Sequence, residues 1–166
     1  MRCAICCLVL ALAGPAGPLG AQVLDRVLAR VDGQAILLSD VRLARAIGLG
    51  GVRADDGDEA ALRRLVERQL MLAEVLRSQP SQPDPAAVAR ATAGFVTRAG
   101  GPEAAAAALR AAGVPEAYLA QLARETTAVD AYLRQRFGAD VAAPARATWA
   151  RDLRRRSRVE CVLPGC

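Results

Sequence analysis

The chain has 166 residues, 53% of them hydrophobic, which suits a single domain with an Ala- and Leu-rich core, favours helices and argues against disorder. Histidine is absent, which excludes Ser–His and Cys–His nucleophile pairs, histidine metal ligands and imidazole acid–base catalysis. The net charge of +5 is the balance of 22 arginines against 17 acidic residues; lysine is absent, and only 3% of the residues are aromatic. Nucleic-acid binders usually mix Lys, Arg and aromatic side chains, so no nucleic-acid partner is predicted.

The first 21 residues follow the sequence pattern of a secretory signal peptide. A positive start precedes an apolar run over 3–13, and Gly-Pro pairs and the small residue Ala21 follow it. Because the run is shorter than the ~20 apolar residues of a bilayer span, we predict removal of 1–21 rather than the alternative, a retained membrane anchor. The mature chain would then be exported, begin near Gln22 and have no stable membrane span.

A β-hairpin is predicted at the start of the mature chain. The apolar stretches 26–31 and 34–38 flank Asp32 and Gly33, a strong signal for a two-residue turn. A ribbon of two strands is only marginally stable in water, so this one needs a third strand or covering helices. The turn predicts the pairs Val31 with Gln34, Ala29 with Ile36 and Val27 with Leu38.

Five helices are predicted after the hairpin. Ser39 is expected to cap the first, with the carboxylate of Asp40 stabilising its first turn. The last residues of an acidic loop over 53–58 are expected to cap the second, and Asp84 the third, whose first residue is Pro85. The helices are expected to end near residues 48, 77, 100, 113 and 138.

The second of these helices is apolar on two sides, which is typical of a central helix that is packed all round. Met71 and Val75 lie four residues apart on the side opposite its broad apolar face. The broad face is formed by Leu62, Leu65, Val66, Leu70, Leu72 and Leu76.

The last part of the chain is predicted to return to the hairpin. A linker over 138–144 leads to a sixth helix, and 158–163 alternates as a strand that has no neighbour in sequence. Joined to the hairpin, this strand would complete a three-stranded sheet. The predicted fold class is therefore mainly α with a small antiparallel β-sheet (α+β), in which the N-terminal hairpin and the C-terminal strand lie on a multi-helix body.

Export alters the interpretation of the five cysteines. Cys3, Cys6 and Cys7 would leave with the signal, so Cys161 and Cys166 remain. In an oxidising compartment these two could close a small loop, with two free thiols or an intermolecular bridge as the alternatives. A disulfide that closes a loop this short would fix the C-terminus and would contribute little to the stability of the fold.

Acidic residues gather in the loop before the second helix, at Asp55, Asp56, Asp58 and Glu59. Helix capping accounts for them, and their spacing lacks the twelve-residue loop and the closing Glu of an EF-hand. We therefore predict no metal site, and no residue pattern in the chain predicts a catalytic site or a cofactor.

At several points the chain resembles the SurA-type periplasmic chaperones. The run 27–41 resembles the family's opening hairpin and the Ser-Asp start of its first helix, and 62–72 is similar to its central helix. Residues 114–119, which run into the fifth helix, and the ending 149–163 also follow the family pattern. The resemblance implies a fold like the SurA N-terminal domain and trigger factor, and a periplasmic location.

The chain departs from the family in one place. Full-length members carry one or two parvulin-type prolyl isomerase domains between the fifth and sixth helices, where this chain has only 138–144. A SurA-like core would thus comprise 22–137, completed by 145–166. The parvulin site as the family builds it also uses histidines, which this chain lacks. The chain is therefore not expected to be an enzyme.

The resemblance implies an ATP-independent chaperone that binds unfolded or nascent envelope polypeptides, with outer-membrane proteins as clients. Such a holdase needs exposed apolar surface, and Met71 with Val75 is the candidate client surface. The alternative is that both residues pack under a neighbouring helix. Two other functions stay open: a dedicated protein–protein interaction module of an envelope assembly system and, more distantly, a protein related to peptidyl-prolyl isomerases.

Overall fold

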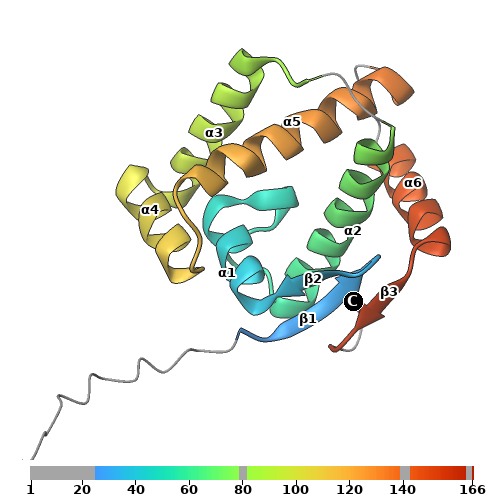
Figure 1. Cartoon of the computed structure of the whole chain (residues 1–166), viewed down its shortest axis with the longest axis horizontal. Coiled ribbons are helices and arrows are strands. Elements are labelled where there is room, and N and C mark those ends of the chain that lie inside the picture. Colours follow the sequence, from blue (N-terminus) through green and yellow to red (C-terminus); the bar gives the residue numbers. More distant parts are fainter. Residues whose placement is uncertain (1–24, 79–81, 139–142, 164–165) are drawn as a thin grey trace, which may run out of the picture.

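The computed structural model describes residues 25–78, 82–138, 143–163 and 166. The predicted signal segment 1–21 lies outside these residues, as do positions 139–142 of the predicted linker. The described residues are mainly helical with one small antiparallel sheet, which confirms the predicted fold class (Figure 1). In chain order the elements are β1 (Val27–Val31), β2 (Gln34–Leu37), α1 (Leu38–Ile47), the 3-10 turn η1 (Leu49–Gly51), α2 (Asp58–Arg77), α3 (Pro85–Ala99), α4 (Pro102–Ala111), α5 (Ala117–Phe137), α6 (Ala143–Arg156) and β3 (Val159–Cys161).

The hairpin forms at the predicted turn between β1 and β2. Asp32 and Gly33 have φ angles of 48° and 87°, the left-handed conformation that lets a two-residue turn follow the twist of the strands. Glycine adopts it without steric cost, and aspartate is among the few other residues that tolerate it. The register agrees with the prediction at Val31 with Gln34 and at Ala29 with Ile36.

The third predicted pair is wrong by one residue. Val27 faces Leu37 rather than Leu38, because the register shifts between Val27 and Ala29. A bulge of this kind places an additional residue in one strand and bends it, and Leu28 and Ala29 are both fully buried here. Leu38 is instead the first residue of α1.

The last strand, β3, pairs antiparallel with β1 and completes a sheet of order β2-β1-β3 (Figure 1). This confirms the predicted third strand. At the two ends of the pairing, the Asp32 N–H donates to the Arg158 carbonyl and the Val162 N–H donates to the Leu28 carbonyl, each over 2.9 Å. The Asp32 carboxylate also accepts the Arg158 N–H at 2.8 Å, so the residue that forms the hairpin turn also holds the start of β3.

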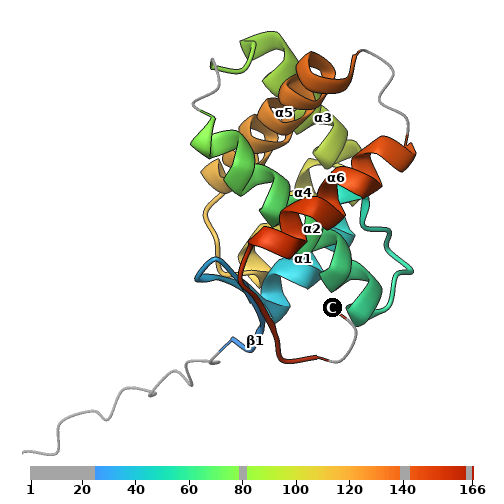
Figure 2. The ribbon, with the colours of Figure 1, turned by 90° about the vertical axis from the view of Figure 1, so that its right-hand side faces the viewer.

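Helix α2 is the centre of the helical body. It contacts α1, α5, α6 and strand β1, and α6 lies across it on the way back to the sheet (Figure 2). Helices α3 and α4 pack beside α1, and α3 also packs along α5. Within the described ranges, no helix combines the length and the apolar composition that crossing a bilayer requires. The largest fully buried side chains are Phe95, Leu28, Ile47, Leu62, Leu70 and Leu153.

Two helices start earlier than predicted, α1 by two residues and α2 by one. Ser39 is the second residue of α1 and does not cap it; the Asp40 carboxylate accepts the Leu37 N–H instead, at 2.8 Å. Helix α2 begins at Asp58, whose carboxylate forms an ion pair with Arg45 over 2.8 Å rather than capping the helix. A side-chain cap must stand on the residue before the helix, so each shift places the expected cap inside its helix.

The third helix starts as predicted and the sixth starts earlier. The Asp84 carboxylate accepts the N–H groups of Ala86 and Ala87 at 3.1 and 3.2 Å, so it caps α3. Helix α6 begins at Ala143. The predicted linker 138–144 is therefore wrong at its last two residues, which are helical.

Cys161 and Cys166 are joined by a disulfide, the first of the predicted alternatives. Their Cα atoms are 6.0 Å apart. The Arg154 guanidinium donates to the Cys166 carbonyl, so the disulfide and this hydrogen bond together hold Cys166 against β3 and α6.

Deletion of residues 157–166 is expected to lower the melting temperature sharply, because it removes β3 and leaves one edge of β1 unpaired. The control is the double variant Cys161→Ser, Cys166→Ser, which keeps β3 and loses only the constraint of a short loop, on the order of 2 kcal/mol. Thermal unfolding followed by circular dichroism compares the two. A deletion that melts together with the double variant would mean that β3 adds nothing beyond the disulfide.

Candidate functional site

A groove of about 570 Å³ lies between the hairpin and the helical body. Strand β2 and the turn before it, the middle and end of α2, the first half of α5 and the start of α1 contribute its lining. Its volume falls within the range of roughly 300–1,000 Å³ that is usual for ligand sites. We call it the hairpin groove. Its apolar lining includes Ile36, Leu65, Leu72, Leu76 and Leu122, and its polar lining includes Gln34, Asp40, Arg68, Gln69, Tyr118, Gln121 and Glu125.

An ion pair between α2 and α5 forms the charged part of the groove. Arg68 Nη2 lies 2.7 Å from Glu125 Oε2, and the Gln121 amide donates to Glu125 Oε1 over 3.0 Å. The side chains of Arg68 and Glu125 are only 13% and 22% exposed, so water and salt screen the pair weakly. The partners stand 57 residues apart in sequence, and no periodic pattern indicates such a contact.

Asp40 and Tyr118 line the groove beside this pair, and the pKa of each is raised. Burial is the main reason that the pKa of Asp40 lies above its ordinary value of 3.8, and the hydrogen bond from the Leu37 N–H opposes the increase. Burial also raises the pKa of Tyr118 above 10.0, with further increases from the carboxylates of Asp40 and Glu125 and a decrease from Arg68. Perturbed pKa values of this kind are more frequent at functional sites than elsewhere.

The groove also exposes apolar surface. Leu76, on the last turn of α2, lines it and is 62% exposed. Among the described residues the other exposed large hydrophobic side chain is Val162, which is 65% exposed and lies after β3, outside the groove. Leu72, one turn before Leu76 on the same helix, continues the apolar wall. The hairpin groove is therefore where accessible apolar surface meets fixed polar groups.

Met71 and Val75 do not form an accessible client surface. They are 3% and 0% exposed, so the alternative interpretation, packing under neighbouring helices, describes them. Helix α2 has α1 and α5 as well as α6 and the sheet as neighbours. The apolar position of α2 that is exposed is Leu76, at the end of the broad face.

The acidic loop before α2 has a structural role around Asp56. Its carboxylate accepts the Arg53 N–H over 2.9 Å and lies 3.3 Å from Nε of Arg64. The hydrogen bond from the Arg53 N–H is the main reason that the pKa of Asp56 is lowered; burial opposes it, and the guanidinium groups of Arg64 and Arg53 lower it further. In the part of the chain that the structure describes, no group of three or more His, Cys, Asp or Glu side chains is placed to hold a metal ion.

A second hollow, of about 620 Å³, shares Arg68 with the hairpin groove and was not indicated by any sequence pattern. Arg98 donates to the Ile47 carbonyl over 2.9 Å and passes so close to Gly48 that a Cβ there would lie 2.6 Å from the Arg98 side chain. Arg98 thus ties α3 to the end of α1. Charges of both signs line this hollow: Arg64, Glu67, Arg68, Arg98, Asp130 and Arg146.

Comparison with known proteins found no relative. No protein-family model, no curated protein and no solved structure matches the chain. A function for the chain therefore has to be inferred from its own residues.

Asp40→Asn is expected to change how stability depends on pH. A carboxyl group whose pKa is raised by folding binds more protons in the native state, so its contribution to the free energy of unfolding falls as the pH rises from near 3.8 through the raised value. Asn retains an oxygen that can accept the Leu37 N–H, but it does not ionise. The stability of the wild type relative to Asp40→Asn should thus decline with rising pH and then level off. Urea titrations from about pH 4 to pH 7 measure this difference, and a constant difference would contradict the expectation.

Proposed function

We propose that the chain is an ATP-independent holdase that binds unfolded polypeptide segments in the hairpin groove. The observation that carries this proposal is the exposed Leu76 beside the polar groups of the groove. A holdase needs accessible apolar surface rimmed by polar groups, and it needs no constellation of catalytic residues. The fixed polar groups keep such a surface from closing on itself, because they lose hydration when they are buried further.

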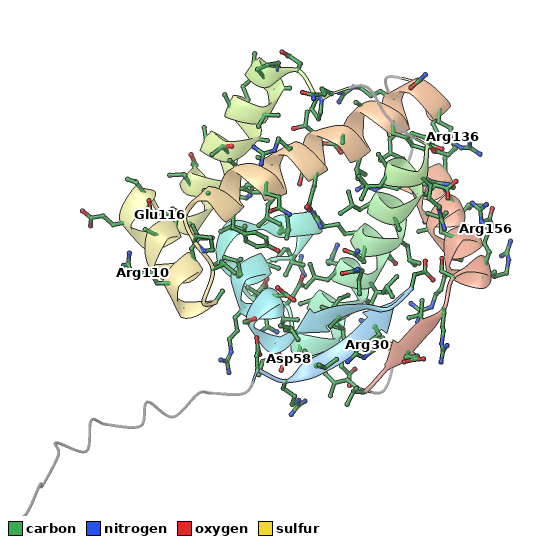
Figure 3. The ribbon with its side chains drawn as sticks, viewed as in Figure 1. Arg30, Asp58, Arg110, Glu116, Arg136 and Arg156 are labelled. Atoms are coloured by element: carbon green, nitrogen blue, oxygen red, sulfur yellow. A yellow bond between two sulfur atoms is a disulfide. The ribbon has the colours of Figure 1, made fainter. Side chains whose placement is uncertain are left out.

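The remaining surface is suited to keeping an unfolded client in solution. Arg30, Arg110, Arg136 and Arg156 project outward from the hairpin, α4, α5 and α6 (Figure 3). Together with a net charge of +5, this charged exterior opposes association between copies of the chain. A bound apolar segment would then be shielded by a protein that itself stays soluble.

The resemblance to SurA-type chaperones supports the identity of the clients. The resembling runs 27–41 and 149–163 fold as the hairpin with the start of α1, and as α6 with β3. We infer that the clients are unfolded or nascent envelope polypeptides in the periplasm, outer-membrane proteins among them. Export would depend on the signal-like segment 1–21.

Leu76→Asp is expected to weaken the suppression of aggregation, because it places a charge on the apolar wall of the groove. The matched control is Val162→Asp, which changes a side chain of similar exposure outside the groove. Light scattering of several unrelated unfolded proteins, at near-stoichiometric amounts of the chain, measures the effect. We expect at least about five times more Leu76→Asp protein to be needed for half suppression, the equivalent of roughly 1 kcal/mol of apolar burial, and no change for Val162→Asp.

The same measurement separates the holdase from a dedicated interaction module. Binding to one folded envelope protein, with no suppression of aggregation, would favour the module. Equal activity of Leu76→Asp and Val162→Asp would show that clients bind outside the hairpin groove.

No acceleration of proline isomerisation is expected from the chain. The parvulin site of the SurA-type family uses histidines, which this chain lacks. Only residues 138–142 separate α5 from α6, where the family has isomerase domains. A protease-coupled assay on an X-Pro peptide measures the rate, with a parvulin as positive control. A clear enhancement would favour the alternative of a protein related to peptidyl-prolyl isomerases.

A further inference from the structure

Strand β2 has one unpaired edge, and this edge borders the hairpin groove. In the order β2-β1-β3, β1 is paired on both sides and β2 on one. Gln34, Ala35 and Ile36 of β2 all line the groove, and Ala35 is exposed. The free edge of a strand is a template for pairing with another extended segment.

The hydrogen bonds of β1 identify the residue of β2 that offers its main chain to the groove. The Leu28 carbonyl and the Asp32 N–H are bonded to β3, so Arg30, two residues from each, also directs its main-chain groups to β3. Arg30 lies opposite Ala35. The two residues therefore form no hydrogen bond with each other, and the N–H and C=O of Ala35 point to the open edge.

The next outward N–H along β2 is already occupied. The Leu37 N–H donates to the Asp40 carboxylate at 2.8 Å. This bond occupies the edge of β2 where α1 begins. Among the described residues of β2, Ala35 is then the one whose N–H and C=O both point to the groove. A short free edge of this kind limits pairing between copies of the chain.

Three glutamines beside this edge carry the same chemical group as a peptide bond. Gln34, Gln69 and Gln121 line the groove from β2, α2 and α5. The Gln121 amide donates to Glu125, while the side chains of Gln34 and Gln69 make no hydrogen bond with another described residue. A carboxamide both donates and accepts, so these side chains are suited to a main chain whatever its sequence.

We propose that an extended client segment binds in the hairpin groove as an added β-strand along β2. It exchanges two hydrogen bonds with Ala35, while alternate side chains contact Leu72 and Leu76. This inference rests on the proposed function and specifies the conformation of the bound segment. Recognition through the main chain is independent of side-chain sequence, as a holdase with many clients requires.

Ala35→Pro tests the main-chain donor. Proline removes an N–H that points away from β1, so the β1–β2 ladder keeps its bonds, and edge strands tolerate proline. Ala35→Val is the matched control, because it changes the side chain and keeps the N–H. The probe is a short fluorescein-labelled peptide in which Leu and Thr alternate, and fluorescence anisotropy measures its Kd. We expect Ala35→Pro to raise the Kd about fivefold or more, and Ala35→Val to change it by less than about twofold.

Hydrogen exchange of the wild type provides a readout that does not depend on the variants. The Ala35 amide, open to the groove in the free protein, is expected to exchange at least about tenfold more slowly when the probe saturates the protein. The Asp32 amide, which is bonded to the Arg158 carbonyl without the probe, is the internal control and should not change.

Leu76→Asp separates the two proposals. If it weakens probe binding, while Ala35→Pro binds like Ala35→Val and the Ala35 amide gains no protection, clients bind in the groove and the strand pairing is overturned. If Leu76→Asp and Ala35→Pro both bind the probe like the wild type, the groove and the strand pairing are overturned together. Should Ala35→Pro fail to fold, the exchange rate of the Ala35 amide decides.

Discussion

The antiparallel pairing of β3 with β1 is the contact on which the rest of the structure depends. With β2 on one edge of β1 and β3 on the other, both edges of β1 are paired. The pairing also brings α6 back across α2 (Figure 2). With α6 in place, α2 is covered on more than one side, and Met71 and Val75 lie in the core. Because β3 pairs with β1 and not with β2, the outer edge of β2 stays unpaired at the groove. One contact between distant segments thus determines what is buried and what stays accessible.

The groove stays open for an electrostatic reason. Arg68 and Glu125 join α2 to α5 through a weakly exposed ion pair, and Asp40 lies nearby with a raised pKa. Closer approach of the hairpin to the helices would remove more water from these groups, which costs free energy unless every group gains a new partner. Leu76 can therefore remain exposed at the groove, beside Leu72, which is buried.

Local chemistry predicted most of the fold, and contacts between distant residues account for the rest. Asp32 and Gly33 specify their turn by themselves, and the glycines and prolines between helices mark where each one ends. The register shift at Leu28, which is fully buried on a strand that contacts α2, is not encoded by the alternation of the strand. Periodicity identified two apolar faces on α2 but not which positions its neighbours cover, and so Leu76 was missed as the accessible one. The Arg68–Glu125 pair depends on the tertiary fold alone.

The sheet cannot be completed until the chain has been made as far as β3 (Val159–Cys161). Asp32 and Arg158, which bond across β1 and β3, are 126 residues apart, and loop-closure entropy delays contacts of such separation. During vectorial synthesis a chain that has not yet reached β3 therefore presents its hairpin with a second unpaired edge. Quality-control proteases, which cleave chains that are locally open, would thus have a physical criterion for telling a chain without a paired β3 from one in which β3 is in place.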